Sequence, residues 1–485
     1  MIMSINYTKF VRKYVKTNRE MLINIGDQIW EFAEMGLEEY KSSALLVKTL
    51  KDVGFKVEEG VADMSTAFTA TYGSEKPVIA ILGEYDALPG LSQLAEPVQK
   101  SLKEGAPGHG CGHNLLGTGA LGCVLAVKEA IDTGVGKGTI RFYGCPAEES
   151  FNAKGWMAVN GLFDDVDITL TWHPGFLNML NAWSALALNS VVFKFYGKTA
   201  HAAGDPHNGR SALDAVELMN IGVNYLREHM ISDARIHYII TNGGKAPNVV
   251  PEFAEVWYYV RAPQRHLVDE LYERVLNIAK GAELMTETKV EIEFLSGCYN
   301  HLHNEIVGEV LYESMRNIGH PKFNKQEREY AEEIQKTINP KWMDAYTRYI
   351  PADFRELATS VLSQPLNNMI VPILGKGQSA PGSTDVADVS WFTPLGEFGT
   401  VCSVMGSPGH SWQNTSTSGM SIGHKGMLAA AKVLALSALK FMNDPELVEK
   451  AQKEFEKKIT ETPYKSPFPE GFKPPYHRLK KSTQN

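Results

Sequence analysis

The chain has 485 residues and a formal net charge of −8, which makes it too long for one ordinary hydrophobic core and gives no positive field for phosphate backbones or anionic lipids. We therefore expect a globular protein of two domains that binds neither nucleic acid nor membranes. The five cysteines form no regular framework, and the N-terminal residues lack the apolar core of a signal peptide, so the expected compartment is the cytoplasm.

The first third of the chain alternates between helical and strand patterns. Residues 17–53 have a helical pattern, and short apolar runs at 67–73, 77–83 and 139–145 are typical of strands. A further apolar helical pattern begins at Asn114, which we expect to be the N-cap. Strands that alternate with helices predict an α/β layer.

A thiol and an imidazole lie within the glycine-rich run Gly-His-Gly-Cys-Gly-His-Asn at 108–114. Cys111 and His113 are ligand types that divalent zinc prefers. The helix expected after them would place Cys111 near a positive helix end, which favours the thiolate. A Cys-x-His pair alone more often has a structural role in the core or on the surface. Other potential ligands in the chain are therefore needed to indicate a metal site.

Two adjacent carboxylates, Glu148 and Glu149, follow the strand expected at 139–145, at the edge where open sheets place their chemistry. They could belong to a solvated turn. A metal site explains them better, because one carboxylate can bind the ion while its neighbour accepts a proton from water. Together with Cys111 and His113 they indicate a metal-dependent hydrolase.

The middle of the chain shows a different order of strand and helix patterns. Strand patterns at 187–196, 235–241, 253–261 and 289–295 alternate with helical patterns at 210–229 and 265–284. This β-α-β-β-α-β order is typical of a ferredoxin-like domain. We therefore expect an inserted domain at 187–297 and a discontinuous first domain formed by 1–186 and 298–485.

The remaining segments carry fewer signals. Residues 300–365 are charged and mostly helical in pattern, without a chemical signature. The apolar stretch at 426–442 contains Lys432 and Lys440, which favours a buried helix over a membrane span. From Pro463 the chain is rich in proline and lysine, which predicts a segment that lies on the surface or frays.

These motifs, with Thr171-Trp-His173-Pro and Ser407-Pro-Gly-His410-Ser-Trp-Gln, resemble the M20 family of dinuclear metallohydrolases, in its amidohydrolase and aminoacylase branch. The segments at 83–90, 108–117, 163–167 and 383–391 are similar to the B-type subunits of aminobenzoyl-glutamate hydrolases. The resemblance extends from about residue 20 to residue 440. It implies an α/β catalytic domain with a mixed sheet and a dinuclear metal site, and an inserted ferredoxin-like α+β domain that serves as lid and dimerisation domain.

The resemblance also implies the metal ligands and the general base. The implied ligands are Cys111, His113, Glu149, His173 and His410. Five ligands are too many for one tetrahedral site, whereas two divalent ions per subunit, Zn²⁺ or Mn²⁺, would use them all through a bridging thiolate or water. Glu148 is the implied general base. Alone, His173 would be read as a core residue and His410 as a surface residue.

Three residues of the inserted domain are implied to contact substrate. His201 would donate to the scissile carbonyl or its oxyanion, often in the site of another subunit, and Asn248 and Arg261 would bind the substrate carboxylate. An arginine suits that role because its planar fork pairs with two oxygens. The alternatives are an ion pair at a strand end for Arg261 and a turn residue for Asn248.

The resulting hypothesis is amide hydrolysis of a small-molecule N-acyl amino acid, with p-aminobenzoyl-glutamate as the substrate that the resemblance implies. The alternatives are an aminoacylase or peptidase for other N-acyl amino acids or dipeptides, and a partner subunit with weak activity of its own. The expected assembly is a homodimer or a heterodimer with an A-type subunit.

Overall fold

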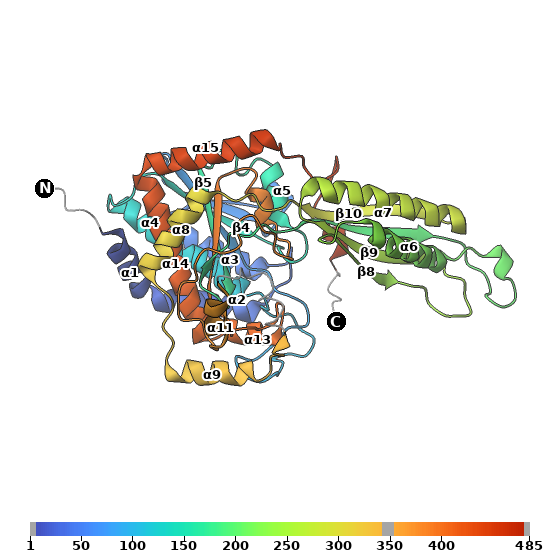
Figure 1. Cartoon of the computed structure of the whole chain (residues 1–485), viewed down its shortest axis with the longest axis horizontal. Helices are drawn as coiled ribbons and strands as arrows, with labels where there is room; N and C mark the ends of the chain where they lie inside the picture. The colour runs from blue at the N-terminus through green and yellow to red at the C-terminus, as the bar shows by residue number, and fades with distance from the viewer. Residues whose placement is uncertain (1–5, 342–353, 480–485) are drawn as a thin grey trace. The chain divides into compact units, whose positions relative to one another are not determined.

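The computed structural model describes residues 6–341 and 354–479. The chain divides into two compact units (Figure 1). The first comprises the described residues of Met1–Trp183, Leu302–Gln378 and Val389–Tyr464, and the second those of Ser184–His301, Ser379–Asp388 and Lys465–Asn485. Two late segments join the second unit because backbone and side-chain hydrogen bonds hold them: Ala380 N–H donates to Ser184 O, and the Tyr299 hydroxyl donates to Lys465 O at 2.8 Å.

The first unit is built on a seven-stranded mixed sheet with the order β1-β2-β4-β3-β5-β11-β6. The strands are β1 (Lys56–Glu59), β2 (Phe68–Tyr72), β3 (Val78–Glu84), β4 (Thr139–Cys145), β5 (Ile168–Gly175), β6 (Met179–Leu180) and β11 (Leu395–Val401). The four central strands run parallel, and β1, β2 and β6 are antiparallel to their neighbours. The predicted α/β layer with a mixed sheet is confirmed.

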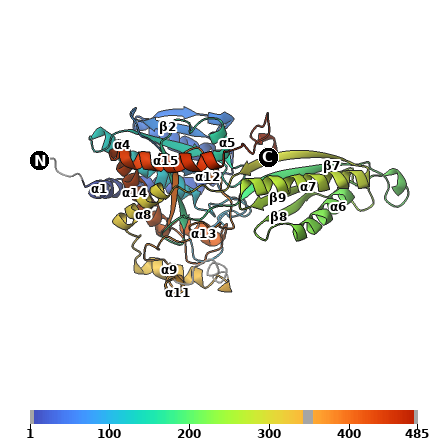
Figure 2. The ribbon, with the colours of Figure 1, turned by 45° about the horizontal axis from the view of Figure 1, so that its top comes forward.

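The first unit also contains the helices around this sheet (Figures 1 and 2). They are α1 (Tyr7–Thr17), α2 (Arg19–Phe32), α3 (Tyr40–Asp52), α4 (His113–Asp132), α5 (Ala153–Val159), α8 (Glu305–Ile318), α9 (Lys325–Gln335), α11 (Arg355–Leu362), α13 (Trp412–Ser418), α14 (Ser421–Asn443) and α15 (Pro445–Glu461), with the short α12 (Val386–Val389) at the boundary between the units.

The helical pattern at 17–53 is two helices and not one. Ala33 ends α2 in a left-handed conformation with φ 43°, and α3 starts where the Glu34 carboxylate accepts the backbone N–H of Lys41 and Ser42. Part of the helical stretch expected at 300–365 lies outside the described residues.

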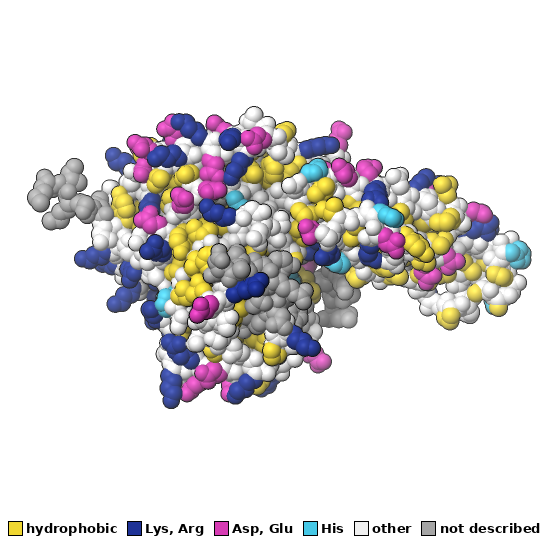
Figure 3. All heavy atoms as spheres, viewed as in Figure 1, with side chains coloured by type: hydrophobic (Ala, Val, Ile, Leu, Met, Phe, Trp, Pro, Cys, Tyr) yellow, Lys and Arg dark blue, Asp and Glu magenta, His cyan; other side chains and the backbone are white. Residues whose placement is uncertain are grey.

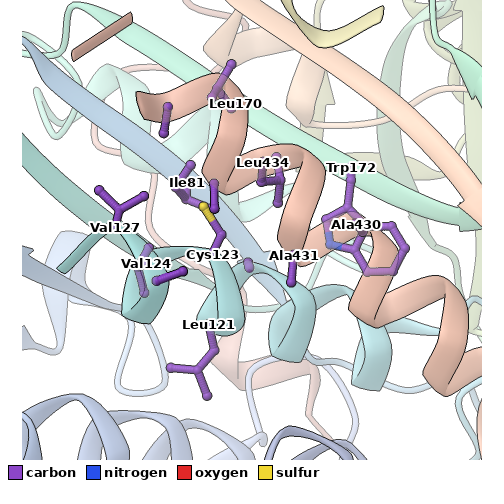
Figure 4. Packing of buried hydrophobic residues seen from close by; sticks show 14 of the residues in the cluster. Ile81, Leu121, Cys123, Val124, Val127, Leu170, Trp172, Ala430, Ala431 and Leu434 are labelled. Carbon is purple, nitrogen blue, oxygen red and sulfur yellow. The ribbon is translucent and has the colours of Figure 1, made fainter. Parts of the chain in front are cut away.

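The core of the first unit forms where α4 and α14 pack on β3 and β5 (Figure 4). A Cβ on Gly119 would lie 2.8 Å from the Trp172 ring, so a glycine is required for this close approach. Both helices are long and apolar enough to cross a membrane, but 83% of the apolar window of each is buried in the unit. They are core helices, as expected for 426–442.

The expected N-cap of α4 is wrong. The N-cap is Gly112, two residues before Asn114 and in a left-handed conformation with φ 78°, and the helix begins at His113. Asn114 lies inside the first turn, fully buried, and its amide donates to the carbonyls of Gly26 and Ser418. Its side chain therefore joins α4 to the middle of α2 and the end of α13 instead of capping its own helix.

The second unit has the predicted ferredoxin-like order. It contains β7 (Ala187–Tyr196), α6 (Ala212–Leu226), β8 (Arg235–Asn242), β9 (Phe253–Ala262), α7 (Arg265–Thr286) and β10 (Lys289–Cys298). The antiparallel sheet has the order β10-β7-β9-β8, and α6 and α7 cover one face (Figures 1 and 2). The proline-rich tail packs against this unit, where Phe468 and Phe472 contact the Phe294 ring and Arg478 pairs with Glu293.

Candidate metal centre

The expected ligands come from loops at one edge of the first sheet. β3, β4 and β5 are parallel, so their carboxyl ends lie at the same edge. Glu84 ends β3, the Glu148–Glu149 pair follows β4, and His173 lies near the end of β5. The tight turn at Gly112 places Cys111 just before α4.

Two groups of potential ligands meet at one sulfur atom. One group contains Cys111, His113 and His173, and the other contains Cys111, Glu149 and His410; within each, all ligand atoms lie within 4.8 Å of one another. The Cys111 Sγ is 3.5 Å from His173 Nε2. All five residues expected as metal ligands are thus brought together, with Cys111 common to both groups.

The buried His113 and the half-buried His173 each use Nδ1 to hold the ring, which leaves Nε2 for a metal ion. His113 Nδ1 lies 2.7 Å from Asp86 Oδ1, and His173 Nδ1 lies 2.7 Å from the carbonyl oxygen of Pro174. Because a carbonyl oxygen only accepts, the His173 Nδ1 carries the proton, and Nε2 has a free lone pair. The other oxygen of Asp86 accepts the backbone N–H of Glu149 at 2.9 Å, so one carboxylate orients two of the candidate ligands.

Several buried polar atoms at this point have no hydrogen-bond partner among the described residues. They are His113 Nε2, Glu84 Oε2 and Glu149 Oε1. His113 Nε2 is 3.1 Å from Glu84 Oε2 and 3.9 Å from Glu149 Oε1. Buried polar atoms are rarely left unsatisfied, and a cation bound to the two carboxylate oxygens and to the deprotonated His113 nitrogen would satisfy all three. The residues present therefore fit a divalent metal.

The electrostatics also require positive charge here. Burial alone would lower the pKa of His113, but the carboxylates of Asp86 and Glu84 raise it well above its usual value. Burial and the neighbouring Glu149 raise the pKa of the Cys111 thiol. Despite burial, His410 and His113 lower the pKa of Glu149. The surrounding carboxylates thus favour a positive charge at this point; a metal ion would supply it and would hold Cys111 as the thiolate.

The loops that carry the carboxylate pair and His410 are strained. Ala147, directly before Glu148, has φ 55°, and His410 itself has φ 53°. Residues other than glycine rarely adopt this left-handed region, and such strain is common at functional sites. His410 Nε2 is 3.3 Å from Glu149 Oε2, and its side chain is 54% exposed, so this ligand lies on the open side of the centre.

A pocket opens beside these residues. It has a volume of about 190 Å³, and its lining includes Cys111, His173 and His410. Glu148 is half-buried and offers a carboxylate oxygen in a third group with Glu84 and His113, again within 4.8 Å. A carboxylate that lies next to the ligands without being needed in either of the first two groups is placed to exchange a proton.

The other three expected residues lie in the second unit. His201 is exposed, and its Nδ1 accepts the backbone N–H groups of Ala203 and Gly204 at 3.2 and 2.9 Å. Its Nε2 therefore carries the proton and can donate. The Asn248 carbonyl accepts from Ala202 N–H at 3.0 Å, so the loops of His201 and Asn248 lie side by side. Arg261 is on β9, with its guanidinium over the Tyr259 ring at 5.1 Å.

Two charged residues of the centre were missed by sequence reasoning. Lys154 Nζ is 2.7 Å from Glu84 Oε1, and both side chains are almost completely buried. Glu84 could have been noticed, because an acid that ends an apolar strand at the edge of a parallel sheet is placed for chemistry. Lys154 carries no such signal, since a lysine in a first helical turn is ordinarily solvated.

Comparisons with known proteins agree with this architecture. Residues 187–284 match the family model described as the peptidase dimerisation domain of M20 proteins. The chain is 42% identical to the B subunit of p-aminobenzoyl-glutamate hydrolase of Escherichia coli, over 96% of this chain and 98% of that protein. It is 27% identical to the Xaa-Arg dipeptidase of Mus musculus, over 91% of this chain and 90% of that protein.

A solved structure shares the fold. A dinuclear metal-binding peptidase from the M20 family of Bacillus subtilis superposes with a TM-score of 0.55 and 16% identity, covering 88% of this chain and 99% of that chain. The 42% identity to the Escherichia coli hydrolase subunit, over nearly the full length of both proteins, is high enough to show that the two share a family. The chain therefore belongs to the M20 peptidase family and is a metal-dependent amidohydrolase.

Proposed function

We propose that this protein hydrolyses the amide bond of N-acyl glutamates, with p-aminobenzoyl-glutamate as its substrate. The observation that carries this proposal is the pair of ligand groups that share Cys111, with Glu148 beside them. An intact ligand set with an adjacent acid supports an active hydrolase over a subunit that only assembles. The near full-length identity to a hydrolase subunit of that name supports the substrate.

The proposed ligands are Cys111, His113, Glu149, His173 and His410, for two divalent ions per subunit. Thiolate and imidazole suit Zn²⁺, and the carboxylate and imidazole donors also suit Mn²⁺. When bound, such ions lower the pKa of water and polarise the scissile carbonyl. Asp86 fixes the ring of His113 and the backbone of Glu149 so that both are oriented before a metal binds.

Glu148 acts as the general base in this proposal. Its carboxylate accepts the proton of the attacking water and later delivers it to the leaving nitrogen, so that the amine departs neutral. His201 donates from Nε2 to the carbonyl oxygen as negative charge develops there. The two backbone N–H groups at its Nδ1 support this role, because they hold the ring in the donating tautomer.

The second unit supports a substrate that carries carboxylates. Arg235 and Arg261 are direct cross-strand partners, so their side chains emerge on the same face of the sheet with Cβ atoms about 5 Å apart. His237 is on the same face, two residues from Arg235. Burial, Arg261, Arg227 and Arg235 lower the pKa of His237. In the described chain, Arg235, His237 and Arg261 have no carboxylate partner within ion-pair distance.

Like charges placed directly opposite each other destabilise a sheet, and an anion between them would reverse this cost. We therefore assign Arg261 and Asn248 to the α-carboxylate and Arg235 with His237 to the side-chain carboxylate of glutamate. The same cations would repel an arginine side chain. The expected substrate preference of this chain therefore differs from that of its relatives named Xaa-Arg dipeptidases.

The test compares kcat/KM for p-aminobenzoyl-glutamate and p-aminobenzoyl-glutamine. Arg235→Gln should lower kcat/KM for the glutamate substrate by about 10-fold to 100-fold, as expected for one charged hydrogen bond, and leave the glutamine substrate nearly unchanged. Arg274→Gln on α7 is the control for the loss of one exposed arginine. Equal effects on both substrates would remove Arg235 from recognition, and no turnover of either by the metal-loaded wild type would refute the proposed activity.

The ligand assignment is tested by metal content. Cys111→Ser should bind less than the two ions per chain expected of the wild type, because a hydroxyl is a much poorer ligand than a thiolate. Cys123→Ser, in the buried middle of α4, is the control for the loss of a thiol elsewhere. Unchanged occupancy in the Cys111 variant, measured by elemental analysis, would exclude this cysteine as a ligand.

The homologue named as a subunit indicates a protein that works in an assembly. We propose that copies pair through the β8 edge of the second unit, where Ile239 and Ile240 are 59% and 45% exposed, with Ile221 and Tyr225 of α6 also exposed. An open apolar edge favours pairing with another strand. Ile239→Lys should shift the mass measured by light scattering to the monomer, whereas Leu284→Lys, at an exposed position of α7, should not. A dimer in both variants would argue for another interface between copies, and a monomeric wild type would argue for an A-type partner.

An aminoacylase or dipeptidase activity on other acids remains the second candidate, favoured by the relatives that act on dipeptides. Assays with N-acyl amino acids and dipeptides that carry neutral or basic side chains distinguish it, because the proposed glutamate site predicts poor turnover of such substrates. For its location we propose the cytoplasm, in keeping with the five free cysteines.

A further inference from the structure

The geometry points to a second binding site, for a small phosphate-bearing anion, in a pocket of the first unit between α1, the C-terminal end of α8 and α14. The pocket has a volume of about 430 Å³, within the range of small-molecule sites. None of the candidate metal ligands lines it. The site is therefore separate from the hydrolytic centre in its lining residues.

The lining is strongly cationic. It contains Arg12, Lys322, Lys425 and Lys432 beside the neutral imidazole of His320, and no aspartate or glutamate is among the lining residues. α1 adds further positive charge, because its sequence Tyr-Thr-Lys-Phe-Val-Arg-Lys-Tyr-Val-Lys-Thr has no acid. In Figure 3, dark blue side chains gather where α1 lies in Figure 1. A concentration of one sign of charge in a concave surface raises the local concentration of the opposite ion.

Two of these cations, Arg12 and Lys322, are hydrogen-bonded only to neutral groups. Arg12 Nη2 donates to the carbonyls of Asn317 and Ile318 at 2.9 and 3.0 Å. Lys322 Nζ lies 2.8 Å from His320 Nε2. Carbonyl and imidazole acceptors orient the side chains but do not neutralise their charges, so an anion gains the full attraction of Arg12 and Lys322.

Among the lining cations, and within the described part of the chain, only Lys425 has a carboxylate partner, Glu327, at 2.6 Å. Lys432 is the decisive residue: it is half-buried, and within residues 6–341 and 354–479 it makes no hydrogen bond or ion pair. Burial and then the charge of Arg12 lower the pKa of Lys432. An ammonium group that is partly desolvated beside another cation is costly in the free protein.

A second lysine of the same helix shows how a purely structural cation is paired. Lys440 Nζ lies 3.0 Å from Glu313 Oε2 of α8. Lys432 is on the same helix and has no such partner, although α14 is otherwise almost entirely apolar and buried. Lys425, Leu428 and Lys432 are spaced three and four residues apart, so they share one face of α14. The helix thus presents Lys425 and Lys432 to the pocket, and in the described chain Lys432 has no carboxylate partner.

Phosphate is the anion chemistry that fits this set. Lysine binds phosphate as a point charge, and arginine binds it through its fork of N–H donors. A doubly charged phosphate can contact Arg12 and Lys432 together and remove their mutual repulsion. The chemistry is shared by free phosphate and by a phosphate monoester, and the probes below separate these two sources.

The experiment measures thermal unfolding of the metal-loaded full chain with inorganic phosphate, pyrophosphate or phenyl phosphate, each against potassium chloride at equal ionic strength. The wild type should show a concentration-dependent rise in Tm, because a ligand that binds only the folded state stabilises it. A larger rise with phenyl phosphate than with phosphate would identify an ester site, and the reverse would identify free phosphate. No rise with any probe beyond that with chloride would overturn the proposal.

The variant Lys432→Met gives two signatures at once. Without phosphate its Tm should be higher than that of the wild type, because a partly desolvated cation has been replaced by an apolar side chain of similar length. With phosphate its apparent Kd should be at least about tenfold weaker, the loss expected for one charged contact. Phosphate that binds at the metal centre would act equally on both proteins, so only the difference between them counts.

Lys440→Met is the matched control on the same helix. It removes a lysine that is paired with a mostly exposed glutamate and does not line the pocket, so it should keep the full response to phosphate whatever its effect on Tm. If Lys432→Met lowers Tm without phosphate and keeps the response, Lys432 is structural and the proposal is wrong. These readouts do not depend on turnover, so they distinguish a failure of this site from a failure of the proposed hydrolysis.

Discussion

Lys154 and Glu84 form an ion pair without solvent contact: Nζ lies 2.7 Å from Oε1, and the side chains are 0% and 2% exposed. Glu84 ends β3, and Lys154 is in the first turn of α5, directly after the loop that carries Glu148 and Glu149. The other oxygen of Glu84 lies 3.1 Å from His113 Nε2. The pair therefore holds the carboxylate loop against the strand end that contacts a candidate ligand.

We expect Lys154→Met to unfold more easily by about 3–5 kcal/mol and to bind less metal, because it leaves the buried Glu84 carboxylate without its cation. Urea denaturation and elemental analysis measure the two effects. Lys48→Met, which breaks an exposed pair with Asp52, is the control and should change little. Lys154→Met with Glu84→Gln should regain part of the stability, and a single variant as stable as the control would contradict a positioning role.

Glu148→Gln should retain metal but lose most turnover, because the amide keeps the shape of the side chain and loses the basic oxygen. General acid–base groups contribute about a hundredfold to ten-thousandfold to rates. The loss should appear in kcat, with KM changed little. Glu104→Gln, an exposed glutamate, should be indistinguishable from the wild type. Near wild-type kcat in a fully metallated Glu148→Gln protein would remove this residue from the mechanism.

Glu397 should make stability fall as the pH rises. Burial, opposed by the hydrogen bond from Asn181 and reinforced by the charge of Glu84, raises the pKa of Glu397 to about 7. The folded protein therefore binds a proton that the unfolded chain releases near its ordinary pKa of 4.5. The stabilisation is complete below pH 4.5 and is lost as the pH rises through 7.

The variant Glu397→Gln tests this directly. It cannot ionise, so its stability relative to the wild type should be greater at pH 8 than at pH 5, by roughly 3 kcal/mol at most. Urea denaturation at the two pH values gives the difference, and Glu58→Gln at an exposed position is the control. The same relative stability at pH 5 and pH 8 would show that Glu397 does not titrate in this range.

Sequence patterns predicted the features that rest on local periodicity and residue type. The ferredoxin-like unit follows from strand and helix lengths, and the glycine-rich run around Cys111 indicated a metal centre because thiol and imidazole are characteristic ligands. The break at Ala33 was missed, because a left-handed residue other than glycine has no clear signal in a helical pattern. Asn114 was misassigned for a related reason: its residue type suits an N-cap, but long-range contacts bury it.

The charges around the centre needed tertiary structure. The Lys154–Glu84 pair joins residues that are far apart in the chain, and nothing in the local sequence marks Lys154 as buried. The pairing of Arg235 with Arg261 depends on the register of β8 and β9. A shift of one residue would give each arginine another partner and place the two side chains on opposite faces of the sheet. Partners of this kind become visible only when strands and helices are placed in space.

His201 should serve a neighbouring copy of the chain, and subunit mixing tests this. Its Nδ1 accepts two backbone N–H groups, so Nε2–H is free to donate to an oxyanion, and removing such a donor costs about a hundredfold to a thousandfold in kcat. His207→Ala, an exposed histidine of the same loop, is the control and should retain activity.

If His201 acts in trans, a mixture of inactive His201→Ala and inactive Glu148→Gln chains should recover activity after subunit exchange. In a hybrid dimer, one of the two sites then has both Glu148 and His201 intact, so random exchange should restore up to about a quarter of the wild-type rate, because half of the dimers are hybrids with one working site each. Exchange is followed by mass spectrometry of differently labelled chains. A cis arrangement leaves every site with one defect, so a fully exchanged mixture without recovery would assign His201 to its own chain.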